Sequence, residues 1–275
     1  MTVSLPSPAL LPSATVLEHR FRQAVGGVGS AAVAFSGGVD SSVVLALLAR
    51  ALSPEEVTAV LGVSPSLAAA ERRGAHAVAA DLGVRLVEVR TREIEDERYV
   101  ANDAARCYFC KHELYSRSLL EVVSDLGVDL FANGDTADDV VRDDRPGKVA
   151  ARELGVRSPL AEAGLGKREV RLIAKDLGLP VWDKPSSPCL ASRIPRSVPV
   201  TVTRLRAVER AELGLRALGF RQVRVRHGGD VGVVELGVDE LARCEDPSVR
   251  ARVGDAVRGA GFGVVDLRSE PLVRD

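Results

Sequence analysis

Between two apolar runs the chain reads Ala34-Phe35-Ser36-Gly37-Gly38-Val39-Asp40-Ser41-Ser42. The run before it, residues 31–35, is short and predicts a buried parallel strand, whereas the longer run 43–52 is rich in helix formers. The chain therefore passes from a strand through a tight turn into a helix. Glycines in the turn allow positive φ and close backbone approach, and the free amides at the helix start favour an anion such as phosphate.

The turn predicts a nucleotide site but is not a Walker A loop, because that motif's spacing and its lysine are absent. The motif Ser-Gly-Gly-Val-Asp-Ser resembles the PP-loop of the ATP pyrophosphatases, which cleave ATP between the α and β phosphates. An ordinary glycine-containing turn is the alternative. The resemblance implies that ATP is held by Ser36, Gly37, Gly38, Asp40, Ser41 and Ser42. The Asp40 carboxylate would bind Mg²⁺ or cap the helix.

Composition sets the class of protein. The 275 residues are 46% hydrophobic and 27% charged, which is typical of a soluble globular protein. No apolar run reaches the ~20 residues needed to span a bilayer, so we expect no membrane segment. Residues 1–15 are proline-dotted and indicate a flexible arm rather than a signal peptide. A net charge of −1 argues against nucleic acid as the partner. Four cysteines without a secretory signal indicate a reducing compartment, by default the cytoplasm.

Strand and helix patterns alternate along the first two thirds of the chain, which predicts an α/β fold with a doubly wound, Rossmann-like parallel sheet. Strands are expected at 31–35, 56–63, 84–89 and 128–133, and helices at 16–25, 43–52, 66–82 and 114–126. Beyond residue 195 we expect a helix over 201–218, a hairpin at 222–236, a helix over 246–260 and a last strand at 263–267. The predicted division is a PP-loop domain at 16–194 and a small α+β domain at 195–275.

A second polar loop, Gly134-Asp135-Thr136-Ala137-Asp138-Asp139, follows the strand at 128–133. Ligands of parallel sheets bind at the carboxyl ends of the strands, so this loop should face the first one. Its carboxylates then suit Mg²⁺ or a ribose. The alternative is a turn in which aspartates cap the next helix.

The pair Cys107 and Cys110 forms a Cys-x-x-Cys motif at or just before a helix start. Such a pair serves as a redox couple, half of a zinc site or ligands of an iron–sulfur cluster. No second pair completes a zinc site. Two buried cysteines that act as small hydrophobic residues are the alternative, but the neighbouring Arg106 and Lys111 should favour thiolates.

The third cysteine, Cys189, lies in a stretch with four prolines between residues 179 and 195, which predicts an extended, stiff loop. Ser192 and Arg193 accompany it. The loop is therefore a candidate reaction site, an interdomain linker, or both. Further on, Arg224 and Arg226 should project from one face of a strand, either as solvated charges or as a clamp for phosphate or carboxylate.

Together these segments resemble the LarE family of ATP-dependent sulfur transferases, over residues 36–235. The specific segments are the PP-loop, Arg106–Lys111 around the cysteine pair, Arg145-Pro146-Gly147, Trp182-Asp183-Lys184-Pro185, Cys189 to Pro195, and Arg224-Val225-Arg226-His227. The resemblance implies that a carboxylate of pyridinium-3,5-biscarboxylic acid mononucleotide is adenylated with release of pyrophosphate. Sulfur is then installed as a thiocarboxylate, for synthesis of the nickel-pincer nucleotide cofactor.

The resemblance also implies residue roles. Cys189 matches the sulfur-bearing catalytic cysteine, and Cys107, Cys110 and Cys189 match the branch of the family that binds a 4Fe-4S cluster. We therefore expect cluster-borne sulfur rather than loss of sulfur from the protein. The positions near the substrate's phosphate and carboxylates are Ser192, Arg193, Glu212, Arg224 and Arg226. Thr136 stands where the family more usually has Asn. Family members tend to form homo-oligomers.

Three other functions remain open at this point. A tRNA-thiolating enzyme also combines a PP-loop with cluster cysteines, but it needs a broad positive surface for RNA phosphates. An amide-forming synthetase of the same fold leaves the cysteines unexplained. A nucleotide-sensing module does not need Cys189 in a proline-stiffened loop.

Overall fold

The computed structural model describes residues 12–141, 146–270 and 272, and its centre is a four-stranded sheet in the order β3-β2-β1-β4. The strands are β1 (Ala31–Ala34), β2 (Val57–Val63), β3 (Arg85–Arg90) and β4 (Leu130–Ala132). All three pairings are parallel, with Ala31 opposite both Val57 and Leu130. The predicted doubly wound parallel sheet is confirmed.

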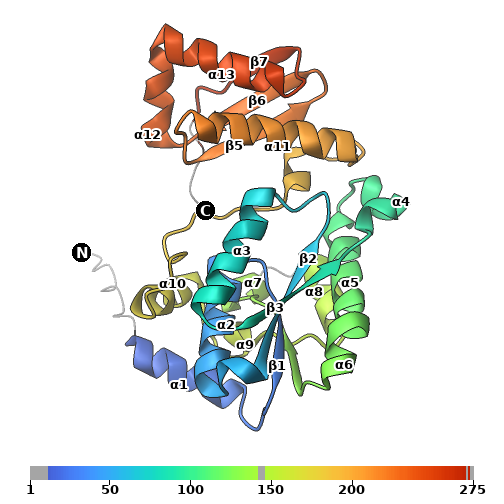
Figure 1. Cartoon of the computed structure of the whole chain (residues 1–275), viewed down its shortest axis with the longest axis vertical. Coiled ribbons are helices and arrows are strands. Elements are labelled where there is room, and N and C mark those ends of the chain that lie inside the picture. Colours follow the sequence, from blue (N-terminus) through green and yellow to red (C-terminus); the bar gives the residue numbers. More distant parts are fainter. Residues whose placement is uncertain (1–11, 142–145, 271, 273–275) are drawn as a thin grey trace, which may run out of the picture.

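Helices cover both faces of this sheet because its strands are apolar on both sides, as parallel strands usually are. Alternate residues of β1 enter different cores: Ala31 and Val33 pack with one cluster, Ala32 with the other. The first face carries α1 (Ala14–Ala24), α2 (Val39–Ala51), α3 (Ala69–Asp81) and α10 (Lys167–Asp176). The second carries α5 (Arg106–Ser118) and α8 (Pro146–Glu153), which lie side by side in Figure 1.

The strand order places the site. From β1 the sheet grows through β2 and β3 on one side, and β4 is then added on the other side of β1. The order of the strands therefore reverses between β1 and β4. Ligands of such sheets bind in the crevice at that point. The loop after β4 meets the loop after β1 closely there, since a Cβ added to Gly134 would lie 2.8 Å from the backbone nitrogen of Ser41. Only glycine permits this contact.

A second, smaller sheet lies apart from the first, in the upper part of Figure 1. Strands β5 (Val223–Gly228) and β6 (Val231–Leu236) form the predicted hairpin, and β7 (Val264–Leu267) adds to β6 in parallel. This sheet packs with α11 (Val202–Ala217) and α13 (Pro247–Gly259), and α12 (Val238–Leu241) follows β6. Their core also takes in Tyr99, from well before the predicted division at 194/195. The domain boundaries stay a prediction.

Several elements differ from the expectation. Helix α5 starts at Arg106, so both cysteines of the pair lie in its first turns, and a π-helical turn (Leu119–Val123) joins it to α6 (Ser124–Leu126). The proline-rich loop ends in a 3₁₀ turn (Leu190–Arg193). The polar loop after β4 becomes helical from its fourth residue, as α7 (Ala137–Val141). Two further single-turn helices, α4 (Glu97–Val100) and α9 (Pro159–Glu162), are too short to leave a periodic pattern.

Most of the predicted arm, residues 1–11, lies outside the described residues. The first helix begins at Ala14. Arg145, from the Arg-Pro-Gly segment, also lies outside the described residues. Within the described ranges, no helix combines the length and the apolar character needed to cross a membrane.

One surface carboxylate gives a pH dependence that can be measured. Hydrogen bonds from Arg72 and His76 lower the pKa of Glu88 to about 2, from 4.5. Because the folded pKa is the lower one, this stabilisation is complete above pH 4.5 and is lost as the pH falls toward 2. We expect Glu88→Gln to lower the free energy of unfolding by about 1 kcal/mol at pH 7, after allowance for solvent screening, and by much less at pH 3.

Urea denaturation at both pH values checks this. Asp81→Asn, at the exposed end of helix α3, which carries Arg72 and His76, is the control for loss of a surface carboxylate. An equal effect of Glu88→Gln at the two pH values would contradict the prediction.

Candidate active site

The PP-loop is held in shape by its own hydroxyl groups. The Gly38 amide donates to Ser36 Oγ at 3.3 Å, and Ser41 Oγ donates to the Gly38 carbonyl at 3.3 Å. Gly37 has φ +68°, and a Cβ there would lie 2.8 Å from the Ala75 Cα of α3. Both the backbone conformation and the close contact therefore require glycine. The loop therefore needs little rearrangement to receive a ligand.

A cavity of about 950 Å³ opens beside this loop and extends to the cysteine-bearing loop and to α11. Its wall includes Ser36, Gly38 and Asp40 from the PP-loop, Glu71, Asp138, Asp139, Lys167, Arg171, Lys184, Cys189, Arg193, Glu212 and Arg216. A smaller cavity of about 210 Å³ adjoins it and is lined in part by Ser41, Lys111 and Gly134. Of the six predicted ATP ligands, Gly37 and Ser42 line neither cavity, and the hydroxyl of Ser42 is buried without a hydrogen-bond partner among the described residues.

A lysine from α10 occupies the place between the two strand-end loops. Lys167 Nζ lies 2.5 Å from Asp40 Oδ2 and 3.0 Å from Asp139 Oδ2. Burial alone would lower the pKa of Lys167, but the two carboxylates raise it overall. Burial would likewise raise the pKa of Asp139, and hydrogen bonds from Thr136 and Lys167 lower it instead. The helix is capped by Gly38, so the capping alternative for Asp40 is wrong, and the carboxylate faces the cavity.

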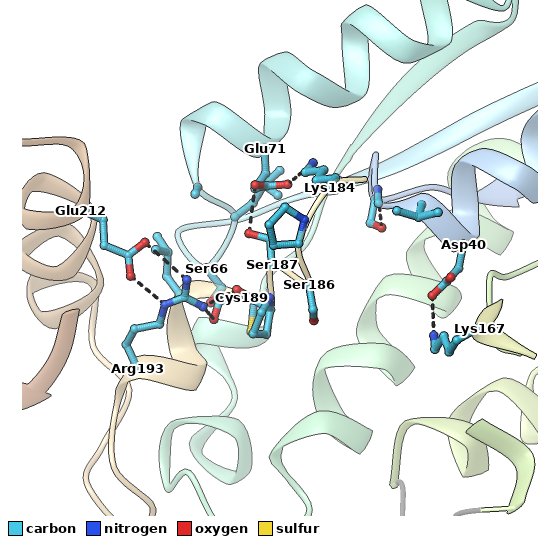
Figure 2. A pocket seen from close by; sticks show the side chains of 18 of the residues that line it. Asp40, Ser66, Glu71, Lys167, Lys184, Ser186, Ser187, Cys189, Arg193 and Glu212 are labelled. Atoms are coloured by element: carbon cyan, nitrogen blue, oxygen red, sulfur yellow. Dashed lines mark hydrogen bonds and ion pairs between the residues drawn. The ribbon is translucent and has the colours of Figure 1, made fainter. Parts of the chain in front are cut away.

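A second lysine ties the PP-loop to the cysteine-bearing loop. Lys184 Nζ donates to the Gly37 carbonyl at 3.1 Å and pairs with Glu71 of α3 at 2.7 Å. Ser187 Oγ donates to the other oxygen of Glu71 at 3.0 Å. Figure 2 shows this group directly above Cys189. Lys184 lies in the Trp-Asp-Lys-Pro segment at residues 182–185, whereas Lys167 lies in no motif named above and Glu71 lies in an alanine-rich helix without a sequence signal.

At the other end of the cavity Arg193 holds the turn that carries Cys189. Its Nη1 donates to the carbonyls of Pro188 and Cys189, at 2.5 and 3.3 Å, and to Ser192 Oγ at 2.9 Å. Its Nε donates to Glu212 Oε1 at 2.9 Å, in an ion pair whose side chains are only 4% and 3% exposed. The substrate role of Arg193, Ser192 and Glu212 stays a prediction; the observed contacts give Arg193 a structural role that the sequence did not indicate.

The cysteine pair lies against the same turn. Arg106 donates to the Ala191 carbonyl at 2.9 Å and to Asn102 Oδ1 at 2.7 Å, and its guanidinium lies 3.9 Å from Cys107 Sγ. The expectation that the basic neighbours make both cysteines thiolates is wrong for Cys110. Burial raises its pKa well above the usual range, with Glu93 and Cys189 acting in the same direction, and Lys111 only partly opposes this. No three His, Cys, Asp or Glu side chains of the described chain converge on a single-ion site.

The predicted arginine clamp lies elsewhere. Arg224 and Arg226 share the outer face of β5, as the alternation predicts, because Val223 and Val225 fill the core. Arg226 pairs with Glu235 of the neighbouring strand at 2.6 Å. Neither arginine is among the described residues that line the cavity. Their substrate role stays a prediction.

The fold and the PP-loop define the class: this is a PP-loop protein of the ATP pyrophosphatase type, and residues 16–140 match the family model described as asparagine synthase. A protein of Synechocystis sp., described as uncharacterized, is 44% identical over 92% of this chain and 93% of its own length. The pyridinium-3,5-bisthiocarboxylic acid mononucleotide synthase of Lactiplantibacillus plantarum is 35% identical over 86% of this chain and 84% of its own length. The chain belongs to the family of this synthase, the LarE family of ATP-dependent sulfur transferases.

A more distant likeness is confined to part of the chain. The tRNA-specific 2-thiouridylase MnmA of Azorhizobium caulinodans is 35% identical over 56% of this chain and 48% of its own length. The predicted family is therefore confirmed, and the tRNA-thiolating enzymes are related through a shared portion only.

Proposed function

We propose that this enzyme uses Mg-ATP to adenylate a carboxylate of pyridinium-3,5-biscarboxylic acid mononucleotide and then converts the acyl group to a thiocarboxylate. The observation that carries the proposal is that one cavity is lined both by the PP-loop and by Cys189. The relative from Lactiplantibacillus plantarum bears the name of the bisthiocarboxylic product, which supplies the substrate. The use of this product for the nickel-pincer cofactor, the cytoplasmic location and the homo-oligomeric state remain predictions.

In the first step a substrate carboxylate oxygen attacks the α-phosphorus of ATP, and the bond from that phosphorus to the bridging oxygen of pyrophosphate breaks. Catalysis of this step needs positioning and neutralisation of charge. The PP-loop amides would hold the phosphates. Lys167 would move its ammonium from Asp40 and Asp139 toward the phosphates, and the Asp40 carboxylate would then turn to Mg²⁺.

In the second step a sulfur nucleophile attacks the acyl carbon, and AMP leaves with the electron pair of the broken C–O bond. If Cys189 itself attacks, a thioester forms and its thiol proton passes to solvent. Loss of the Cα proton of Cys189 with cleavage of the Cβ–S bond then releases the thiocarboxylate and leaves dehydroalanine. The exposed position of Cys189 on the cavity wall suits attack on a bound acyl group.

The three cysteines offer the alternative source of sulfur that the sequence favours. Thiolates are the usual ligands of 4Fe-4S clusters, and the contact between Arg106 and Ala191 brings the start of α5 against the Cys189 turn. The chemistry of the donor set suits such a cluster, and the ligands would be Cys107, Cys110 and Cys189. Bound there, a cluster with one iron free of protein ligands would supply an exchangeable sulfide.

Iron analysis separates the two sources. Protein reconstituted under anaerobic conditions should bind iron, lose it in the Cys107→Ser variant, and keep Cys189 intact after turnover by mass spectrometry. Absence of iron, together with dehydroalanine at position 189, would exclude the cluster and leave the sacrificial route.

Pyrophosphate release from Mg-ATP under anaerobic conditions tests the proposed function. The mononucleotide and bulk tRNA are compared as acceptors. We expect release with the mononucleotide alone. Release with tRNA alone would overturn the substrate assignment and favour tRNA thiolation.

Replacement of Lys167 should weaken the first step. In Lys167→Met, Asp40 and Asp139 lose their shared counter-ion and the triphosphate loses a cation, so we expect KM for ATP to rise about 10- to 100-fold with a lower kcat. Steady-state pyrophosphate release measures both constants. Lys175→Met, on the same helix but outside the cavity lining, is the control. An unchanged KM for ATP would remove Lys167 from the phosphate site.

A further inference from the structure

The end of the cavity away from the PP-loop carries an excess of positive charge. One carboxylate, that of Glu212, lies between two guanidinium groups: Arg193 Nε is 2.9 Å from its Oε1, and Arg216 Nη1 is 3.7 Å from its Oε2. Glu212 Oε1 also accepts from the Val225 amide at 3.1 Å. A single negative charge therefore faces two positive ones, and this end of the cavity is left with a net charge of about +1.

The two arginines are not equivalent. Arg193 is 4% exposed, and its N–H groups donate to Glu212, to two carbonyls of the Cys189 turn and to Ser192. Arg216 is 34% exposed, lines the cavity, and reaches Glu212 only at 3.7 Å, which is beyond hydrogen-bonding distance. Among the described contacts at this end, Arg216 is thus the cation with donors left for a ligand.

The position of this cation relative to the other groups suggests what it binds. Figure 2 shows Cys189 between the Glu212–Arg193 pair on one side and the Asp40–Lys167 pair on the other. A substrate with its reacting carboxylate at the PP-loop would extend past Cys189 toward α11, where Arg216 lines the cavity.

We propose that Arg216 binds a distal oxyanion of the acyl acceptor, a phosphate monoester or a second carboxylate, through the paired N–H groups of its guanidinium. This inference rests on the proposed function, because it takes the acceptor to be the pyridinium mononucleotide, which carries both groups. A guanidinium is suited to either, since its fork matches two oxygens of one oxyanion. The Glu212 carboxylate, held by Arg193, also attracts the Arg216 guanidinium at 3.7 Å and so helps to orient it.

The experiment compares Arg216→Gln, Arg216→Lys and Arg206→Gln with the wild type in pyrophosphate release. Arg206 is an exposed arginine of the same helix that does not line the cavity. Loss of a charged, bidentate contact should raise KM for the mononucleotide about 10- to 100-fold in Arg216→Gln, leave KM for ATP within about twofold, and be partly restored by lysine. Arg206→Gln should match the wild type. Thermal unfolding of each variant verifies that it is folded.

A second arm identifies the oxyanion by using the nucleoside that lacks the 5′-phosphate as the acceptor. If Arg216 binds the phosphate, wild type and Arg216→Gln have equal KM for the nucleoside; if it binds the second carboxylate, they differ as before. Either result supports the inference. Equal KM for the intact mononucleotide in wild type and Arg216→Gln would overturn it, as would an equal rise in KM for ATP.

Equilibrium binding of the mononucleotide without ATP, measured by calorimetry, decides the inference independently of turnover. Weaker binding to Arg216→Gln than to wild type supports it even if no acceptor stimulates pyrophosphate release, whereas the proposed function fails in that case. Equal binding to both proteins overturns the inference.

Discussion

Cys189→Ala should abolish formation of the thiocarboxylate, by at least about 1000-fold, while adenylation continues. The residue lies at the end of the proline-rich loop, exposed on the cavity wall, and the contacts that shape the PP-loop are made by Ser36, Gly38 and Ser41. Removal of one sulfur atom leaves those contacts in place. In the proposed chemistry this sulfur is the nucleophile or a cluster ligand, so its removal should stop the transfer of sulfur.

Single-turnover quenching provides the measurement. The variant should release one equivalent of pyrophosphate per active site and accumulate acyl-adenylate, and no thiocarboxylate should be detected by mass spectrometry. Cys244→Ala is the matched control, because Cys244 is 2% exposed in the core of the second sheet and takes no part in the proposed chemistry. Thiocarboxylate formation by Cys189→Ala at more than a few per cent of the wild-type rate would contradict the assignment.

Glu212→Ala should have the largest effect on stability. The substitution leaves the Arg193 guanidinium buried at 4% exposure without its counter-ion and removes the acceptor of the Val225 amide. Breaking a buried ion pair from one side costs about 3–5 kcal/mol of the free energy of unfolding. Urea denaturation monitored by circular dichroism measures the loss.

A double variant separates the ion pair from general packing. Arg193→Met with Glu212→Leu removes both charges, so it should recover most of the stability that Glu212→Ala loses. The sulfur-transfer step should be impaired in this double variant, because a methionine side chain has no N–H groups to donate to the carbonyls of Pro188 and Cys189. A loss below about 1 kcal/mol in Glu212→Ala would show that the pair is not the stabilising contact described.

Much of this architecture is predictable from local pattern. The Gly-Gly turn between residues 31–35 and 43–52 predicts a nucleotide site at a strand end, and the alternation of strands and helices correctly predicts the parallel sheet. The cysteines stand out by residue type and by their surroundings in sequence. These features depend on neighbours within a few positions, so one sequence reveals them.

The contacts that complete the site depend on distance in space instead. Glu71 and Lys184 are 113 positions apart in sequence, and Asp40 and Lys167 are 127 apart. No periodicity or spacing of the sequence predicts these contacts. Electrostatic expectations fail in the same way: Lys111 follows Cys110 directly, but burial governs the pKa of that thiol. Arg193 shows the limit most clearly, because its residue type suggests a ligand and its buried contacts make it a support for the Cys189 turn.

That support divides the site between two cores. The groups proposed to bind the phosphates are attached to α2 and α10, which pack in the core of the parallel sheet, whereas the turn that carries the sulfur is attached through Arg193 and Glu212 to α11, which packs with the second sheet. Contacts of Lys184 and Ser187 with Gly37 and Glu71 join the two parts across the cavity. The two proposed half-reactions therefore depend on different parts of the hydrophobic core.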